Sequence, residues 1–296
     1  MEEFHQGDIV GRKSYGADIY FKIIGFVEIE GGKFACLKGV YTRLCASAPL
    51  EDLVRIESRE QMKRLRDLTL KSNEQMGRIF ARRQREREFF LGRAVKSDKD
   101  SPKKSSNVQG FDIPGTVLHI DGDGDYLDLC MNTYKQLSIP ANGYNISEEE
   151  QPGIVEGLLK KHAPDMLVIT GHDGYIKGSE DFKDITNYYS SKYFVDAVKV
   201  ARGYEKSKDD LVIFAGACQS HYEALLKAGA NFASSPLRVM IHAYDPVFVM
   251  EKIAYTSIYD PISIKEIIAG TITGFDGIGG VESRGKFRLG IPVSPY

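Results

Sequence analysis

The sequence predicts an α/β fold in which a doubly wound, mostly parallel sheet follows a small all-β unit. After Gly110, short apolar runs alternate with longer segments of helical periodicity, a pattern typical of a parallel sheet with helices on both faces. The runs at 166–171 and 211–217 are rich in Val, Ile and Leu, as suits the buried centre of such a sheet. Before residue 57 the apolar runs are separated by turn residues, which favours a separate unit of short strands.

Residues 1–56 predict a small SH3-like β-barrel. Strands are expected at Ile9–Arg12 and Ile19–Gly25, and Glu30–Lys33 predicts a hairpin turn before Phe34–Leu37. A barrel of this kind either binds or positions a partner or serves as a structural or regulatory appendage, and the sequence leaves both roles open.

Residues 57–110 predict a basic helix followed by a flexible linker. From Glu57 to Arg93 the chain has helical spacing, no proline, and 11 Lys or Arg against 6 Asp or Glu. This excess is explained by a solvated helix face or by contact with an anionic partner. The stretch 94–110 is polar and rich in serine and lysine, so we place the domain boundary there and the α/β domain at 111–296.

Within this last domain the elements follow one another at the spacing of strand and helix pairs. Strands are expected at 116–121, 141–146, 166–171 and 211–217, helices at 125–137, 148–162, 189–203 and 220–228, further elements at 238–243, 246–255 and 262–272, and glycine-rich turns at 277–285.

Composition narrows the class of protein. The 296 residues carry a formal net charge of −2, which gives no global reason for nucleic-acid or membrane attraction. The start lacks the pattern of a signal peptide and no apolar run approaches the ~20 residues of a membrane span, so a cytoplasmic location is expected. The four cysteines show no C-x-x-C spacing, and neither a metal nor a cofactor is expected. Three of them are read as small core residues: Cys36, Cys45 and Cys130.

Two of the buried strands each lead to one half of a possible catalytic pair. The run at 166–171 is followed by His172, and the run at 211–217 is followed by Cys218. The carboxyl ends of neighbouring parallel strands lie at one edge of the sheet, where α/β proteins place their sites. A thiol becomes a nucleophile when an adjacent imidazole takes its proton, so this pattern predicts a thiol hydrolase.

The order of the pair favours a caspase-like arrangement. His172 lies 46 residues before Cys218, which leaves room for one crossover helix, and papain-like enzymes have the reverse order. Ala217-Cys218-Gln219 matches the caspase signature around the cysteine, except that Ser220 stands where a glycine follows.

Segments around these residues resemble the YabG family of sporulation-specific proteases along nearly the whole chain. The resemblance implies a cysteine endopeptidase in the mother-cell cytoplasm of an endospore-forming bacterium, which acts on spore-coat and cortex-associated proteins. The residue order also resembles the caspase, legumain and clostripain group, whose fold agrees with the predicted sheet. The segments that carry the resemblance are Ile169–Asp173, Phe214–His221, Ala230–Pro236, Gly7–Val10 and Arg12–Tyr15.

Carried over to this chain, the resemblance implies that Cys218 is the nucleophile and His172 its base. In the caspase-like group a glycine follows the histidine and offers its N–H to the oxyanion. Here Asp173 and Gly174 follow, so either backbone amide could serve, and the Asp173 carboxylate could orient the imidazole or bind a basic substrate side chain.

Other polar residues are weaker candidates. His221 could line the cleft or act as base, and Asp245 could border a specificity pocket, although capping of a helix is the commoner role. The acidic run Asp121–Asp125 suggests calcium, but Tyr126 and Asn132 stand where an EF-hand needs Gly and Glu, so helix capping is preferred.

The distribution of basic residues suggests a substrate preference and self-processing. Arg and Lys are concentrated between Arg82 and Lys104, next to the predicted linker. We therefore expect cleavage after Arg or Lys, with Asp173 or Asp245 contacting the basic side chain, and trimming of the N-terminal region within this window.

Two other functions remain open. A class I amidotransferase-like enzyme would also use Cys218 but would need a downstream base such as His242. A non-catalytic spore-coat interaction protein would use the basic helix and the barrel, and its Cys218 would be unreactive.

Overall fold

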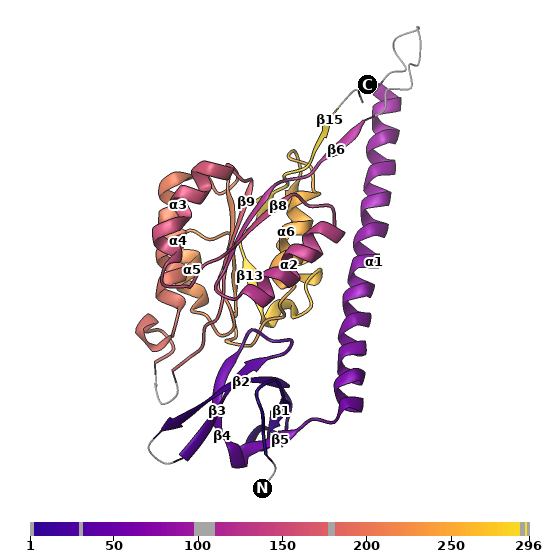
Figure 1. Ribbon diagram of the computed structural model, residues 1–296. Coiled ribbons are helices and arrows are strands. Elements are labelled where there is room, and N and C mark those ends of the chain that lie inside the picture. Colours follow the sequence, from indigo (N-terminus) through magenta and orange to yellow (C-terminus); the bar gives the residue numbers. More distant parts are fainter. Residues whose placement is uncertain (1–2, 30–31, 98–109, 177–180, 291–293, 295–296) are drawn as a thin grey trace.

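The computed structural model describes residues 3–29, 32–97, 110–176, 181–290 and 294 (Figure 1). Its centre is a six-stranded sheet with the strand order β13-β11-β10-β9-β7-β8. The five strands other than β13 are mutually parallel, and β13 pairs antiparallel with β11. The predicted α/β fold with a mostly parallel sheet is therefore confirmed. The strands are β7 (Val117–Asp121), β8 (Ala141–Asn145), β9 (Met166–Thr170), β10 (Val212–Ala215), β11 (Phe232–Ser234) and β13 (Ile278–Gly280).

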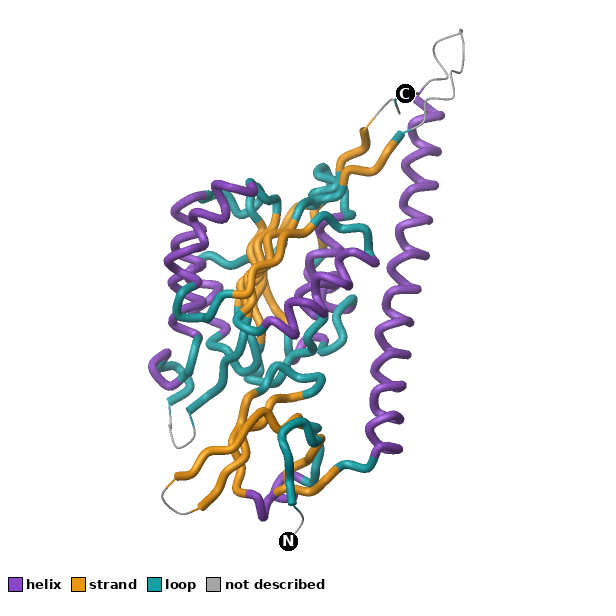
Figure 2. The backbone as a smooth tube through the Cα atoms, in the orientation of Figure 1, coloured by secondary structure: helices purple, strands orange, loops and turns teal. Residues whose placement is uncertain are grey.

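Helices cover both faces of this sheet, which divides the apolar core into two layers (Figure 2). One layer packs α3 (Gln151–His162), α4 (Ser191–Tyr204) and α5 (Tyr222–Ala228) against the sheet. The other contains α2 (Gly124–Gln136), α6 (Asp245–Ala254) and α7 (Ile264–Ala269). Strands β7, β9 and β10 are buried throughout, because side chains from both faces of a central strand meet a helix layer.

The N-terminal residues form a separate five-stranded antiparallel sheet with the order β4-β3-β2-β1-β5. Its strands alternate buried and exposed side chains, and Val10, Ile23 and Leu37 form the centre of a small core. This confirms an antiparallel β unit before the helix, whereas the SH3-like barrel stays a prediction. The strands are β1 (Ile9–Arg12), β2 (Phe21–Ile29), β3 (Gly32–Gly39), β4 (Cys45–Pro49) and β5 (Leu53–Arg55), with short 3₁₀ turns at Lys13–Tyr15 and Leu50–Asp52.

A single helix, α1 (Ser58–Ser97), runs from the N-terminal sheet along the side of the α/β domain that carries α2 and α6 (Figure 1). The many charged residues of α1 are the reason why a solvated face was predicted. One side of α1 nevertheless packs on the α/β domain, because Ile79 is buried in its core. Arg82 and Arg83 both bind the buried carboxylate of Glu251 on α6, at 2.8 and 2.7 Å. The expected linker at 94–110 lies mostly outside the described residues.

The remaining elements are small. Two-stranded antiparallel sheets join β12 (Pro261–Ile262) to β14 (Ser283–Arg284), and β6 (Phe111–Ile113) to β15 (Arg288–Gly290). Residues 238–243, for which an element was expected, form no strand but contain the isolated antiparallel bridge between Thr42 and His242. Short 3₁₀ turns lie at Ile185–Asn187 and Gly274–Asp276.

Candidate active site

The structure places His172 and Cys218 just beyond the carboxyl ends of two adjacent parallel strands, β9 and β10. Ile169 on β9 pairs in register with Ala215 on β10, and each candidate residue lies three positions after its paired residue. The Thr170 hydroxyl donates to the Gly216 carbonyl at 3.0 Å, which joins the two strand ends. The two residues are thus brought to the same edge of the sheet, as expected of parallel strands.

Local contacts fix the turn that follows each strand. The amide of His172 donates to the Glu148 carboxylate at 2.6 Å, and that carboxylate packs where a side chain on Gly171 would lie. Gly216 has φ +102°, a conformation that residues with a side chain rarely adopt. Gln219, directly after the thiol, is also left-handed at φ +57°, a backbone feature that clusters at functional sites.

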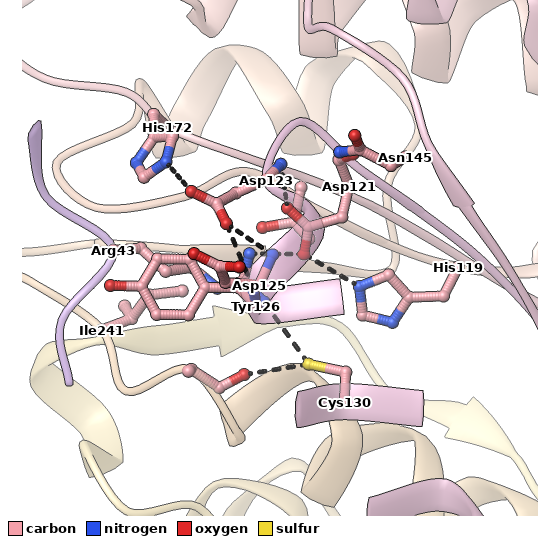
Figure 3. Close-up of polar contacts among 12 residues, drawn as sticks. Arg43, His119, Asp121, Asp123, Asp125, Tyr126, Cys130, Asn145, His172 and Ile241 are labelled. Carbon is pink, nitrogen blue, oxygen red and sulfur yellow. Dashed lines mark hydrogen bonds and ion pairs between the residues drawn. The ribbon is translucent and has the colours of Figure 1, made fainter. Parts of the chain in front are cut away.

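The His172 ring contacts an acid and a thiol, and neither belongs to the predicted pair. Its Nε2 lies 2.7 Å from Asp123 Oδ2 (Figure 3). Both ring nitrogens lie 3.8 Å from the sulfur of Cys45. Burial alone would lower the pKa of His172, but the bonds to Asp123 and Cys45 outweigh it and raise the pKa to about 10. His172 is therefore an imidazolium at neutral pH in this conformation.

Cys218 is fully buried and bonds to backbone rather than to His172. Its sulfur accepts the amide of Ile241 at 3.3 Å, and burial raises its pKa to about 12. The main chain and the charge of Arg43 both act to lower the pKa of this thiol, but burial outweighs them. Among the described contacts no hydrogen bond joins Cys218 to either nitrogen of His172, so the direct contact expected from the sequence is not made in this conformation. Thiol and imidazolium are both in the wrong protonation state for nucleophilic attack.

The N-terminal sheet lies against this edge of the central sheet and supplies several of its polar contacts. Lys38 on β3 binds Asp123 at 2.7 Å and Asp125 at 2.6 Å, while Cys45 on β4 lies against His172. Between these strands, Arg43 projects into the α/β domain and binds Asp121 at 2.5 Å with both side chains fully buried. Figure 3 shows Arg43, Asp121, Asp123 and His172 gathered around the start of α2.

The acidic run after β7 has the capping role preferred from the sequence. Asp123 is the N-cap of α2, and its carboxylate accepts the amides of Asp125 and Tyr126. It also holds His172 and Lys38, and these hydrogen bonds and charges outweigh burial and lower its pKa. Among the residues described, no group of three or more His, Cys, Asp or Glu side chains could hold a metal ion.

The two carboxylates expected to recognise a basic substrate side chain are otherwise engaged. Asp173 accepts hydrogen bonds from the Gly174 and Ser190 amides and from two serine hydroxyls, Ser191 and Ser220. Asp245 is fully buried and accepts hydrogen bonds from the amides of His242, Ile272 and Thr273 and from the Thr273 hydroxyl. Both therefore organise loops.

The histidines considered as alternative bases are also held elsewhere. His221 is the N-cap of α5, with Nδ1 accepting the amide of Ala224 and Nε2 2.9 Å from the Lys183 carbonyl. His242 is largely buried, which lowers its pKa to about 4, and its Nδ1 accepts the amide of Tyr244. Neither ring is recorded in a hydrogen bond with Cys218 in the described part of the chain.

Comparison with known proteins supports the resemblance found in the sequence. The family model described as YabG peptidase U57 matches residues 5–292. A curated relative from Bacillus subtilis (strain 168), described as a sporulation-specific protease YabG, is 41% identical over 291 residues, which is 98% of each chain. The chain belongs to the YabG peptidase family. No solved structure matches it.

For this YabG family member, sequence reasoning missed the part of the site that the N-terminal sheet supplies. Lys38, Arg43 and Cys45 lie more than 70 residues before the sheet edge that they contact, and their sequence context is that of ordinary strands. Cys45 was expected in a core but is exposed at the surface of β4. No helix in the described residues has both the length and the apolar character to cross a bilayer.

Proposed function

We propose that this protein is a cysteine endopeptidase of spore formation in which Cys218 is the nucleophile and His172 the general base. The observation that carries the proposal is the equivalent position of the two residues, each three residues beyond the in-register pair Ile169 and Ala215. The relative described as a sporulation-specific protease supports the biological setting. The order of His and Cys and the mostly parallel sheet support a caspase-like arrangement of this domain.

The chemistry divides into two steps. His172 takes the thiol proton, and the Cys218 sulfur attacks the scissile carbonyl carbon to give a tetrahedral oxyanion. The imidazolium then protonates the leaving amine, the C–N bond breaks, and a thioester remains on Cys218. Water, deprotonated by His172, hydrolyses the thioester and returns the thiol.

The conformation seen here has to change before this chemistry begins. His172 is held as an imidazolium by Asp123, and Cys218 is a buried neutral thiol. The first feature depends partly on the N-terminal sheet, which supplies Cys45 to the ring. The second comes from burial, because the Arg43 charge lowers the pKa of the Cys218 thiol and does not raise it. We therefore describe the structure as a latent form of the peptidase.

For the oxyanion, we favour the amide of Asp173 over that of Gly174. The Gly174 N–H already donates to the Asp173 carboxylate at 2.8 Å, and that carboxylate is tied to three further donors. An amide that is already hydrogen-bonded to a carboxylate is a poor donor to a second anion.

The natural substrates that we propose are spore-coat and cortex-associated proteins, met in the mother-cell cytoplasm and cut after Arg or Lys. Self-processing between Arg82 and Lys104 belongs to the same proposal. Because α1 is helical to Ser97, and Arg82 and Arg83 bind Glu251, cleavage at these two residues requires α1 to detach and unwind. The part of the window beyond Ser97 lies outside the described residues.

The test is hydrolysis of a denatured protein substrate by the full-length protein and its variants. Cys218→Ala and His172→Ala should each abolish cleavage without loss of the folded structure seen by circular dichroism. Cys45→Ala is the matched control, because Cys45 is the thiol that touches His172, and it should retain turnover. Loss of activity in Cys45→Ala with activity retained in Cys218→Ala would disprove the assignment.

The same proteins distinguish the rival functions. An amidotransferase-like enzyme would release ammonia from glutamine in a Cys218-dependent manner and would leave protein substrates intact. A spore-coat interaction protein would show neither activity. We expect proteolysis alone, because His172, and not His242, follows the strand that pairs in register with the strand before Cys218.

A further inference from the structure

Arg43 is an unusual residue in the molecule, since its whole guanidinium group is buried inside a domain other than its own. It lies between β3 and β4 of the N-terminal sheet, yet its relative exposure is 0%. Its Nη1 donates to Asp121 at 2.5 Å, its Nη2 to the sulfur of Cys130 at 3.4 Å, and its Cζ lies 5.0 Å from the centre of the Tyr126 ring. The α/β domain thus has a cavity shaped and charged for a basic side chain.

Asp121 is the acid that makes this cavity selective for a cation. Its carboxylate is fully buried at the end of β7, where burial raises its pKa and the Arg43 charge outweighs that effect. The other titratable group beside it, His119, is 3.4 Å away and is also fully buried, which lowers the pKa of the imidazole. With His119 neutral, Arg43 is the charge partner of Asp121, and an uncompensated buried carboxylate would be costly.

The main chain just before Arg43 pairs with the α/β domain as one end of a bound peptide would. Thr42 forms an antiparallel bridge with His242, and the Tyr126 hydroxyl is 2.6 Å from the Thr42 carbonyl oxygen. Antiparallel pairing with an exposed backbone segment is a common way for a protein to hold an extended peptide. The segment that pairs with Thr42 is also the one that reaches the nucleophile, since the Ile241 amide donates to Cys218.

Cys218 lies close to the segment that carries Arg43. Its sulfur accepts the amide of Ile241, and the next residue, His242, pairs with Thr42, so the nucleophile lies beside the backbone that leads into the residue filling the acidic cavity. A peptidase that cuts after a basic residue needs this relationship between its nucleophile and its specificity pocket. An ion pair that served only to join the two domains would have no reason to lie at the nucleophile.

We propose that the cavity holding Arg43 is the pocket for the basic residue before the scissile bond, that Asp121 is its selecting carboxylate, and that Arg43 occupies it as a built-in ligand. This inference rests on the proposed peptidase function. It replaces Asp173 and Asp245 with Asp121 as the acid that recognises the substrate.

The geometry also explains why Arg43 is a ligand and not a substrate. The Leu44 amide donates to the Thr42 carbonyl at 2.7 Å, so the chain makes a tight turn centred on Arg43 where a substrate would be extended. The imidazole base is meanwhile held by Asp123. Withdrawal of Arg43 empties the pocket beside a cavity of about 180 Å³ lined by Thr42, Tyr20 and His242. It breaks the buried ion pair with Asp121, so it is favoured when a basic substrate side chain takes the place of Arg43.

The experiment compares full-length wild type, Arg43→Ala, Arg43→Ala with Asp121→Asn, and the control Arg55→Ala, whose guanidinium binds Asp8 within the N-terminal sheet. Two fluorogenic peptides are used that differ only in Arg or Gln before the scissile bond, with benzamidine as a competing cation. We expect Arg43→Ala to raise kcat/KM for the Arg peptide by about tenfold or more, because the apparent affinity rises with the fraction of empty pockets. Benzamidine should inhibit this variant competitively, whereas Asp121→Asn should remove both the preference for Arg and the inhibition.

A second readout does not depend on turnover. In Arg43→Ala, iodoacetamide should alkylate Cys218 faster than in wild type, and benzamidine should slow this alkylation unless Asp121 is also replaced. Lys38→Ala, which removes the ion pairs of the same sheet with Asp123 and Asp125 and keeps Arg43 and Asp121, provides the comparison if Arg43→Ala folds poorly, and should also speed alkylation.

The outcomes separate the two claims. If Cys218-dependent hydrolysis occurs in wild type, but Arg43→Ala is no faster and benzamidine neither inhibits nor protects, the pocket assignment is wrong and the peptidase assignment stands. If no variant hydrolyses a peptide while benzamidine still protects Cys218 in an Asp121-dependent manner, the cation pocket stands and the peptidase assignment is wrong.

Discussion

Nε2 of His172 lies 2.7 Å from Oδ2 of Asp123, so the proposed base faces an N-cap carboxylate and not the proposed nucleophile. The pKa of His172 is raised to about 10 by this bond and the contact with Cys45, against the effect of burial. The ordinary pKa of an exposed histidine is about 6.5, so folding favours the protonated ring.

This relationship predicts how stability depends on pH. A raised folded-state pKa contributes stability that is complete below about pH 6.5 and is lost as the pH rises through about 10. In full-length Cys218→Ala, the free energy of unfolding should fall over this range, by an amount on the order of a few kcal/mol. Asp123→Asn should flatten the dependence in denaturant titrations. Asp125→Asn is the control, because the Asp125 carboxylate binds Lys38 but does not contact His172. An equal flattening in both variants would contradict the view that the bond between Asp123 and His172 causes the pH dependence.

The hydrogen bonds of Asp173 predict a loss of stability without a change in specificity. Two donors bind each oxygen of Asp173, and Asp173→Asn keeps only one oxygen, so two of the four donors that hold the loops after β9 and β10 lose their acceptor, at roughly 2–3 kcal/mol of unfolding free energy. The ratio of kcat/KM for Arg and Gln peptides should not change. Asp196→Asn, at an exposed position on α4, is the control and should change neither the stability nor this ratio. A selective loss of cleavage after Arg in Asp173→Asn would show that Asp173 recognises the basic substrate side chain.

The exposure of the cysteines predicts the order in which they react. Cys45 is exposed and Cys218 is fully buried with its pKa at about 12, so iodoacetamide should modify Cys45 first in the wild type. Cys130, buried beneath Arg43 with its pKa also raised to about 12 by burial, should react slowly as well. Peptide mass spectrometry of timed samples measures the order, and early modification of Cys218 would mean that the closed arrangement is not the main form in solution.

The contact between α1 and α6 predicts where the helix is protected. Glu251 is almost fully buried and binds both Arg82 and Arg83, so Glu251→Gln removes the charge that holds both guanidinium groups on α6 and leaves Arg82 only its pair with Glu86 on α1. Breaking such a pair costs roughly 3–5 kcal/mol, and trypsin should then cut after Arg82 and Arg83 much faster in a Cys218→Ala background. Glu266→Gln, which alters an exposed partner of Lys252, should leave the trypsin pattern unchanged.

The arrangement of the α/β domain could be predicted from sequence because its signals are local. Strands such as β9 and β10 are continuous apolar runs and can be recognised in the sequence. The residues that directly follow parallel strands lie at the carboxyl edge of the sheet, so their position can be predicted as well. The same reasoning placed His172 and Cys218 at one edge and expected capping for the acidic run that contains Asp123.

The contacts across the two domains could not be predicted in this way. Arg43 and Cys45 act on residues far along the chain, and nothing in the flanking sequence distinguishes a buried arginine from a surface one. Asp173 was considered for substrate binding because it adjoins His172, but neighbouring residues in a turn point in different directions, and its carboxylate faces Ser191 and Ser220. Asp121 was grouped with its capping neighbours because its partner was unknown.

The length and anchoring of α1 have a consequence for any cut made in the chain beyond it. Forty helical residues extend about 60 Å, and Gln75, Arg82 and Arg83 bind the α/β domain from the middle of the helix. A broken peptide bond past Ser97 therefore does not free the first hundred residues. It leaves a nicked, two-piece complex that migrates as one particle on a sizing column and separates only in denaturant, so a gel band of reduced mass is not by itself a sign of an unblocked enzyme.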